Sequence, residues 1–324
     1  MPELPEVQTT VDGLNKKAKG LKIIDAWSIY NSPYYKSKQN IKDPDFFKEF
    51  KERITGAKIT YAERRAKNIL IHLDNNETIL IHMKMTGHLI FGKYVNTHTN
   101  KGVEKSKNKD DPWKPVDKDN KALNDPFNSH IRLVFSLQKD GSSKVVNQNQ
   151  LVLSDTRKFA KITVIKTDKV FHSPDLAHLG PEPLTKDFNF EIFKNQINKK
   201  SNGKIKTVLL DQTIIAGIGN IYSDEALWLA NIHPESVVKK INIKVLKNLF
   251  DSVLLVLKKG IDFGGDSMSD YRNINGEKGG FQEKHNAYRR KGMVCKKRLC
   301  GGIIKRIVVG GRGTHFCEKH QIKY

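Results

Sequence analysis

The chain has 324 residues, and its 57 Lys and Arg against 35 Asp and Glu give a net charge of +22. No apolar run approaches the roughly 18 residues that cross a bilayer, and no secretory or lipidation signal opens the chain. We therefore expect a soluble, cytoplasmic protein, associated with the nucleoid if the host is bacterial. The positive charge favours a polyanionic partner such as nucleic acid. The length and the 38% apolar content allow two cores.

The N-terminus combines an unusual nucleophile with two acids. Removal of Met1 from the opening Met1-Pro2-Glu3-Leu4-Pro5-Glu6 would leave the secondary amine of Pro2 as the N-terminus. An α-amino group titrates near pH 8, so part of it is unprotonated at neutral pH and can attack a sugar or carbonyl carbon. Glu3 and Glu6 could move the protons that such a reaction requires. The alternative is a flexible start with no catalytic role.

Short β-rich segments dominate residues 1–177. They are ITGAKITYAE, NILIHLDNNETILIHM, HIRLVFSLQKDG and NQLVLSDTRKFAKITVI. Their apolar residues recur at every second position, and the DNN and KDG breaks indicate hairpins. This pattern predicts a β-sandwich or flattened barrel.

A polar stretch at 95–128 interrupts the strand pattern. It mixes charges and contains few aliphatic residues, which predicts a mostly disordered, solvated surface loop. Trp113 and Phe127 are its two candidate anchors.

The composition changes after LGPEPL, whose prolines and glycine predict a hinge at 178–187. From there to residue 265 the apolar residues follow a helical period in FNFEIFKNQI, IKTVLLDQ, NIYSDEALWLANI and INIKVLKNLFDSVLLVLKKGIDF. In the turn before the third helix, Gly217 and Gly219 bring the backbone close to some other group. Asn220 is a candidate N-cap, and the free N–H groups beside it could receive a phosphate.

The cysteines favour a metal site over a disulfide framework. Cys295, Cys300 and Cys317 all lie near the C-terminus, and with His320 they form C-x4-C-x16-C-x2-H. Four such ligands suit one tetrahedral, structural Zn2+ ion. We therefore predict a zinc-finger hairpin at 293–324.

Ordered blocks along the chain resemble the formamidopyrimidine-DNA glycosylase family. They are PELPEVQTT, RRAKNIL, HMKMTGHL, DTRKFA, LGPEPL and GIGNIYSDE. The resemblance implies an α+β protein with an N-terminal catalytic β-sandwich domain (1–177, with 95–128 as an insertion), a hinge, and a helix-two-turn-helix DNA-binding domain (188–265). A base-capping loop and linker (266–292) and the zinc finger would follow. The family ends in a four-cysteine finger, so His320 and the longer first Cys spacing put the geometry of this zinc site in doubt.

The resemblance also assigns catalytic roles. Pro2 would attack C1′ of the damaged nucleoside, Glu3 would act as general acid, Glu6 would shape the network around the proline, and Lys67 would contact the phosphate beside the lesion.

Further residues match the family's DNA contacts. Met85, Arg157 and Phe159 correspond to the side chains that fill the gap left by a flipped base. The matched phosphate-binding positions are Lys206, Asn220, Tyr288 and Arg312. The family has proline and a second arginine around Arg157, where this chain has Thr156 and Lys158. The charge is retained, but the rigidity of the loop is in doubt.

A glycine-rich stretch at 264–292 matches the loop that closes over an everted base and indicates oxidised purines as substrates. We therefore expect a bifunctional DNA glycosylase and AP lyase of base excision repair. It would act as a monomer on damaged double-stranded DNA, without a nucleotide cofactor. An endonuclease VIII-like enzyme for oxidised pyrimidines is the main alternative. A damaged-DNA-binding protein without catalysis is another, and an N-terminal-proline tautomerase is a remote third.

Overall fold

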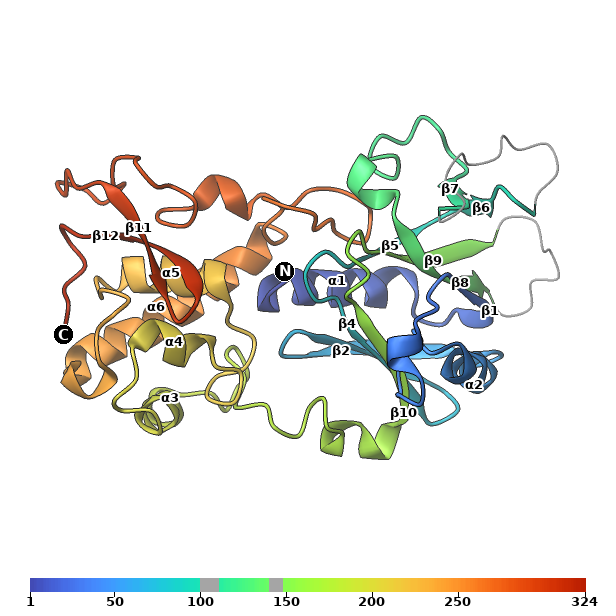
Figure 1. The fold of residues 1–324 in the computed structure, drawn as a ribbon, viewed down its shortest axis with the longest axis horizontal. Helices are drawn as coiled ribbons and strands as arrows, with labels where there is room; N and C mark the ends of the chain where they lie inside the picture. Colours follow the sequence, from blue (N-terminus) through green and yellow to red (C-terminus); the bar gives the residue numbers. More distant parts are fainter. Residues whose placement is uncertain (100–110, 140–147) are drawn as a thin grey trace. The chain divides into compact units, whose positions relative to one another are not determined.

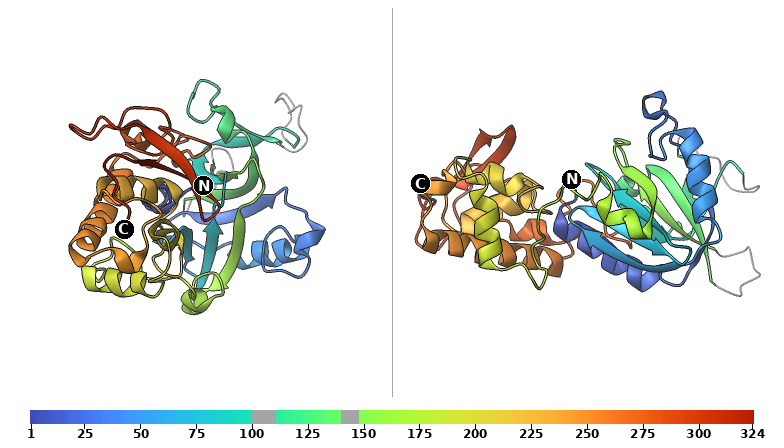
Figure 2. Two further views of the ribbon diagram at one scale, coloured as in Figure 1. Left: turned by 60° about the vertical axis from the view of Figure 1, so that its left-hand side comes forward. Right: turned by 90° about the horizontal axis from the view of Figure 1, so that it is seen from below.

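A computed structural model describes residues 1–99, 111–139 and 148–324. Contacts divide the chain into two compact units. The first contains Met1–Pro2, Glu6–Leu176 and Asp266–Gly279, and the second contains Glu3–Pro5, Ala177–Gly265 and Gly280–Tyr324. Figures 1 and 2 show the elements of each unit.

Two antiparallel four-stranded sheets form the first unit (Figure 1). One has the order β1 (Lys22–Ser28), β8 (Ile131–Gln138), β9 (Asn149–Ser154) and β5 (His88–Gly92). The other has the order β10 (Lys161–Lys166), β4 (Glu77–His82), β3 (Asn68–Leu73) and β2 (Ile59–Arg65). Since the sheets share no strand, the unit is a sandwich and not a closed barrel. The DNN break lies in the β3–β4 hairpin, as predicted; the KDG break falls partly outside the described residues.

The core of the first unit contains alternate residues of both sheets and two helices that the strand pattern of 1–177 does not predict. These helices are α1 (Leu4–Lys17) and α2 (Pro44–Ile54). In α1 the buried Val7, Val11 and Leu14 follow helical spacing, and Phe46 and Phe50 do the same in α2. That spacing is the signal that the strand-based interpretation missed.

The polar stretch at 95–128 is ordered where it is described. It includes β7 (Trp113–Pro115), which pairs with β6 (Tyr94–Asn96), and a 3-10 turn at Pro126–Asn128. Trp113 contacts Trp27 edge-on, with ring centroids 5.9 Å apart. The prediction of a mostly disordered loop is therefore wrong for 95–99 and 111–128, because aromatic and ionic contacts hold these residues. Residues 100–110 lie outside the described part.

The second unit contains the four predicted helices and the C-terminal hairpin (Figure 2). They are α3 (Phe190–Asn198), α4 (Ile205–Leu210), α5 (Asn220–Leu229) and α6 (Ile243–Asp262), followed by β11 (Ile304–Val309) and β12 (Arg312–Cys317). Buried residues of α6 recur at helical spacing and pack with α5. The predicted α+β class is thus confirmed. None of the described helices has the length and apolarity needed to span a membrane.

Candidate active site and nucleic-acid interface

Glu3 caps a helix of the second unit. Its buried carboxylate accepts the backbone N–H of Ile221 at 2.9 Å and that of Tyr222 at 3.4 Å, both in the first turn of α5. Free N–H groups and the helix dipole favour a negative charge at this position. The side chain predicted to be the general acid is therefore held by backbone donors.

The two glycines before α5 make room for this N-terminal segment. A Cβ atom on Gly219 would lie 2.2 Å from Cδ of Glu3. Gly217 has a φ of +95°, and a Cβ there would lie 2.8 Å from Cδ1 of Leu4. The close approach predicted from GIGN is thus to residues 3 and 4 of the same chain.

Glu6 is fixed within the first unit. Its buried carboxylate accepts the Asp266 N–H at 2.7 Å, and its backbone carbonyl accepts the Tyr271 hydroxyl at 3.1 Å. Burial raises the pKa of the Tyr271 phenol, which keeps it protonated as a donor. The start of the predicted base-capping segment is therefore attached to the helix that carries Glu6.

Lys67 lies in the two-residue turn that joins β2 to β3. Ala66, the first turn residue, has a φ of 55°, and the flanking Arg65 and Asn68 are paired. A positive φ at the first turn position is typical of the type II′ hairpin. This turn fixes the backbone of Lys67, whose side chain is buried.

His82 is a candidate site residue that the sequence did not indicate. It pairs with Asn68 across β3 and β4, and its Nδ1 accepts the Lys84 N–H at 3.0 Å. Burial and then the charges of Lys84 and Lys67 lower its pKa to about 3, so the imidazole is neutral and carries its proton on Nε2. The sequence could have indicated His82, because it lies in the same HMKMTGHL block as Met85.

One carboxylate organises the two loops that carry Met85, Arg157 and Phe159, here called the wedge loops (83–87 and 155–160). Buried Asp155 accepts the Thr86 hydroxyl at 2.5 Å, the Ala160 N–H at 2.8 Å and the Tyr30 hydroxyl at 3.3 Å. The loops are thus joined without the proline that the family has next to Arg157. Asp155 is a second residue that sequence reasoning missed, although it begins DTRKFA.

The wedge loops expose the predicted gap-filling side chains. Met85 is 37% and Phe159 47% exposed, and the Arg157 guanidinium lies 4.5 Å from the centroid of the Phe159 ring. Exposed apolar side chains beside a stacked cation suit contact with bases. Their role in filling a gap stays a prediction.

Lys206 lies beneath the first turn of α5. Its fully buried ammonium donates to Asp224 at 2.5 Å, to the Ser223 hydroxyl at 2.7 Å and to the Asn220 carbonyl at 3.0 Å. Burial lowers its pKa, against the opposing effect of Asp224. Since the ammonium is occupied in this way, its predicted phosphate contact stays a prediction, and we propose that Lys206 positions Asn220.

Asn220 and Arg312 are brought together by β12. Asn220, the first residue of α5 rather than its N-cap, donates its side-chain N–H to the Gly313 carbonyl at 2.9 Å. Its Oδ1 is buried with no partner among the described residues. Arg312 is exposed beside the Gly310–Gly311 turn, whose φ values of 55° and 73° suit a tight hairpin turn.

Tyr288 is held by Glu225, another residue missed from the sequence. The buried Glu225 carboxylate accepts the backbone N–H groups of Ala287 and Tyr288, each at 2.8 Å. The Tyr288 ring contacts His315 at a centroid distance of 5.3 Å. A carboxylate with several backbone donors fixes a loop firmly.

The first-unit part of the predicted capping loop, here called the capping segment (Asp266–Gly279), is anchored to the 111–128 region. Arg272, 1% exposed, forms two hydrogen bonds with Asp125 at 3.0 and 3.2 Å. The Asn128 side chain donates to the Gly276 carbonyl at 3.1 Å. This segment is therefore not the free loop that its glycine content suggests.

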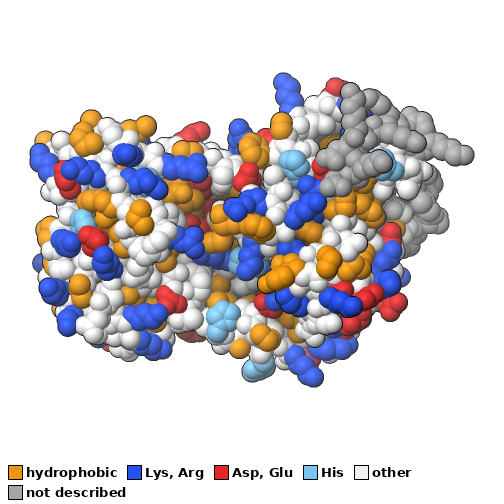
Figure 3. Space-filling model, in the orientation of Figure 1, with side chains coloured by type: hydrophobic (Ala, Val, Ile, Leu, Met, Phe, Trp, Pro, Cys, Tyr) orange, Lys and Arg blue, Asp and Glu red, His pale blue; other side chains and the backbone are white. Residues whose placement is uncertain are grey.

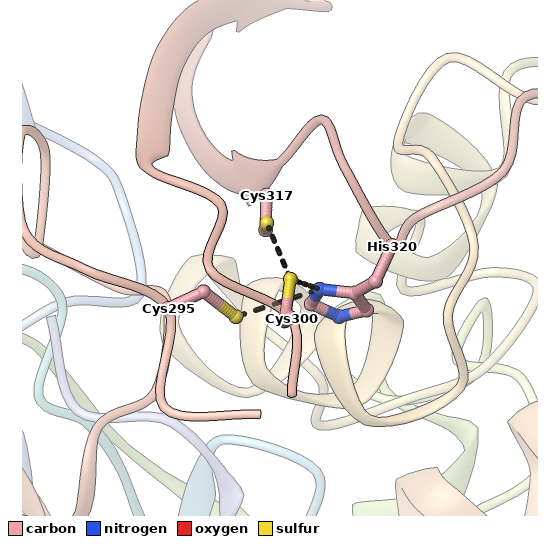
Figure 4. Close-up of side chains that lie close together, drawn as sticks. All are labelled: Cys295, Cys300, Cys317 and His320. Atoms are coloured by element: carbon pink, nitrogen blue, oxygen red, sulfur yellow. Dashed lines mark hydrogen bonds between the residues drawn. The ribbon is translucent and has the colours of Figure 1, made fainter. Parts of the chain in front are cut away.

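The predicted zinc ligands converge at the base of the C-terminal hairpin (Figure 4). One donor atom from each of Cys295, Cys300, Cys317 and His320 lies within 4.8 Å of all the others. The Sγ atoms of Cys300 and Cys317 are 3.6 Å apart, and His320 Nδ1 is 3.4 Å from Cys295 Sγ. Ligands on tetrahedral zinc at bond lengths of about 2.0–2.3 Å are separated by roughly 3.5–3.8 Å, so the donor set fits this ion.

The surroundings complete the metal site. His320 Nε2 donates to the Trp228 carbonyl at 3.1 Å, which leaves Nδ1 as the ligand atom. A Cβ on Gly302 would lie 2.6 Å from Cys317 Sγ, so glycine is required there. The extra residues in the first Cys spacing are thus compatible with a compact site.

Family models match the chain in three segments. The formamidopyrimidine-DNA glycosylase N-terminal domain matches residues 1–162, its H2TH domain matches 179–272, and a zinc finger found in FPG and IleRS matches 294–319. Together with the Cys and His cluster, the last match confirms one structural zinc.

Curated relatives are similar over nearly the whole chain. The formamidopyrimidine-DNA glycosylase of Ligilactobacillus salivarius is 36% identical over 99% of both chains, and that of Bacillus subtilis is 35% identical over 100% of both. A Lactococcus lactis Fpg in complex with abasic-site DNA matches with a TM-score of 0.77 and 31% identity, over 99% of this chain and 100% of that one. A MutM structure with DNA containing carbocyclic 8-oxo-G matches with the same score, identity and coverage.

Proposed function

Because the chain belongs to the formamidopyrimidine-DNA glycosylase family, we propose that it removes oxidised purines from duplex DNA and then cleaves the abasic strand. Its substrates are 8-oxoguanine and formamidopyrimidines. Solved relatives bound to DNA with 8-oxo-G and Fapy-dG support this choice over oxidised pyrimidines, as does the full-length 264–292 stretch. The excess of Lys and Arg over Asp and Glu side chains, visible on the face in Figure 3, suits a DNA partner.

The observation that carries the proposal is the local setting of the N-terminal motif. Glu3 is fixed by the N–H groups that begin α5, and Glu6 by the Asp266 N–H, so the two acids next to Pro2 are held by separate backbone donors. Preorganised acids of this kind lower the barrier to proton transfer.

The reaction begins after Met1 is removed and the damaged nucleotide is flipped out of the duplex. The Pro2 nitrogen forms a bond to C1′, while the C1′–N bond to the base breaks and the base leaves with the proton that the Pro2 nitrogen gives up. Glu3, whose backbone donors favour the ionised form, first takes a proton from the Pro2 ammonium and then gives it to the ring oxygen. This proton transfer opens the sugar and gives an iminium between Pro2 and C1′. Glu6 keeps the proline nitrogen in place, and Lys67 contacts the neighbouring phosphate.

The iminium makes the C2′ hydrogens acidic. Loss of one of them breaks the C3′–O bond and releases the 3′ phosphate. A second elimination releases the 5′ phosphate, and hydrolysis of the iminium restores Pro2. Both activities thus share one covalent intermediate.

Other residues support binding. We propose that Met85, Arg157 and Phe159 fill the gap in the duplex, that Asn220, Tyr288 and Arg312 contact phosphates, and that the zinc site held by the Cys and His cluster keeps Arg312 in place. The protein acts as a cytoplasmic monomer without a nucleotide cofactor.

Borohydride trapping tests the proposal directly. The wild type should form a stable crosslink to abasic DNA, whereas Pro2→Gly should form none and still bind DNA. Trapping by a protein with an uncleaved N-terminal tag would exclude Pro2 as the nucleophile, and a wild type that binds without trapping would be a binding protein only. Comparing excision of 8-oxoguanine opposite cytosine with excision of thymine glycol tests the endonuclease VIII-like alternative.

A further inference from the structure

A pocket of about 660 Å³ lies along β10, the outermost strand of its sheet in the first unit, and is here called the edge pocket. Its lining comes from four places: β10 with Lys161, Thr163 and Ile165, the 35–40 loop, the 169–175 turn that follows the strand, and the wedge loops with Lys84 and Phe159. The Ile41 N–H donates to the Ile162 carbonyl at 3.1 Å, so the 35–40 loop is attached to the strand. The volume lies in the range of about 300–1,000 Å³ that is usual for small-ligand sites.

The lining is strongly basic. Lys38, Lys84, Lys161 and Lys169 contribute to it together with His172, while Asp175 is its one acidic residue and is paired with Lys161 at 2.5 Å. The other three lysines form no ion pair with any residue in the described ranges. Burial and then Lys161 lower the pKa of Lys84, as expected where cations are crowded. The edge pocket therefore attracts an anion.

Two lining residues also have buried hydroxyl groups without partners. Thr163 Oγ1 and Ser173 Oγ form no hydrogen bond within the described part of the chain, although both are buried. Polar groups in protein interiors are nearly always satisfied, so these two hydroxyls are candidate hydrogen-bond partners for a ligand of the edge pocket. Hydroxyl donors beside ammonium groups suit phosphate oxygens.

Flat rings line the edge pocket beside the cations. Phe159 lines it, and so does Tyr35, whose ring centroid lies 5.3 Å from Lys38 Nζ. Aromatic faces stack with bases irrespective of their sequence. The ligand that satisfies cations, hydroxyls and rings together is a nucleotide unit.

We propose that the edge pocket binds a nucleotide unit of the undamaged strand, the strand opposite the lesion. Phe159 belongs to both the edge pocket and the wedge loops. The proposed function places the wedge loops in the gap left by the flipped base, which faces the undamaged strand, so the inference rests on that function. None of the proposed contacts to the damaged strand involves Lys38, Lys169 or Tyr35. The edge pocket thus extends the DNA footprint beyond the wedge.

Affinity measurements on matched substrates test this. A Lys38→Ala, Lys169→Ala variant should bind an abasic-analogue duplex at least tenfold more weakly at moderate salt, with a log–log salt slope smaller by roughly 1–2. It should bind the damaged strand alone as the wild type does. A Lys16→Ala, Lys19→Ala variant removes two exposed lysines of the same unit from outside the pocket and should behave like the wild type. Equal losses on duplex and single strand, or no loss on duplex, would overturn the proposal.

Replacing single phosphates of the undamaged strand by uncharged linkages shows which phosphate the edge pocket contacts. Methylphosphonates placed one at a time along the undamaged strand should weaken wild-type binding at one or two positions, and the Lys38/Lys169 variant should be insensitive at those positions. The same positional pattern in the wild type and the variant would contradict the proposal.

The ligand could also be a free nucleotide. Titration of dAMP and of inorganic phosphate, followed by NMR, should give only weak, millimolar binding. Tight dAMP binding that the variant loses, with duplex binding unchanged, would assign the pocket to free nucleotides and overturn the strand assignment. Borohydride trapping on single-stranded abasic DNA should be the same in variant and wild type, which separates failure of the pocket from failure of the proposed chemistry.

Discussion

The wedge loops and the C-terminal hairpin present DNA-contact candidates in two different ways. The wedge loops are tied by one carboxylate, Asp155, which accepts from Tyr30, Thr86 and Ala160. The hairpin ends at a cluster of three thiols and an imidazole, with the exposed Arg312 at its other end. A hydrogen-bonded anchor forms with the core around it, whereas a metal anchor depends on an ion from outside. The two regions should therefore lose their structure under different conditions.

Loss of the metal should have the largest effect. Cys317→Ala, or treatment with a strong chelator, should release one zinc and unfold the hairpin, because structural zinc contributes on the order of 10 kcal/mol to such small elements. DNA affinity should fall on the order of tenfold or more, since Arg312 loses its support. Metal analysis and anisotropy would check this.

The control for metal loss is the first unit. Thermal unfolding of the sandwich should be unchanged by the chelator. Cooperative loss of both units would show that the two anchors are not independent.

Removal of the carboxylate anchor comes next. Asp155→Ala should lower the free energy of unfolding by about 3 kcal/mol, because it leaves several buried donors unpaired at roughly 1–3 kcal/mol each. Excision should fall with zinc content unchanged. Asp155→Asn, which keeps an acceptor oxygen, should lose less in denaturant unfolding. Equal losses in the two variants would contradict the hydrogen-bond explanation.

The capping segment provides a third kind of anchor, an ion pair. Asp125→Ala should lower the free energy of unfolding by about 2 kcal/mol. This is less than the loss expected on breaking a fully buried ion pair, because the Asp125 side chain is 19% exposed. Its largest functional effect should be on base excision, with cleavage of preformed abasic sites nearly unchanged. The exchange Asp125→Arg with Arg272→Asp should recover part of the loss. Absence of any recovery would show that the charges do not act as a pair.

The smallest expected effect is the pH dependence of this ion pair. Burial opposes ionisation of Asp125, but hydrogen bonds from Arg272 and the Phe127 N–H outweigh it and hold the pKa below its ordinary value. A depressed folded-state pKa gives stability that is fully present above the unfolded pKa of about 3.9 and is lost as the pH falls through the folded value. The stability difference between wild type and Asp125→Asn should thus be constant from pH 7 to about 5 and shrink below about 4. A difference that does not vary down to pH 3 would contradict this.

Local patterns predicted the parts of the fold that depend on local periodicity. The alternation of apolar residues in β3 and β4 was sufficient to predict these strands, and the helical spacing in α6 was sufficient to predict this helix. The spacing of Cys295, Cys300, Cys317 and His320 identified the metal site. The anchors were harder to predict, because Asp155, Glu225 and Asp125 act on partners that are distant in sequence or belong to the backbone. A carboxylate that holds a loop has no spacing of its own, and the pairing of Arg272 with Asp125 joins residues 147 positions apart.

The position of Glu3 limits where this chain can be cut into two fragments. Glu3 belongs to the second contact unit and Glu6 to the first, so the boundary crosses the hexapeptide to which we assign the chemistry. A gene fragment ending at Leu176 would encode Glu3 without the amides that receive it, and one beginning at Ala177 would encode α5 without its capping carboxylate. Either fragment alone would therefore lack one partner of the Glu3 cap, and we expect the start of α5 to be less stable in the fragment that begins at Ala177.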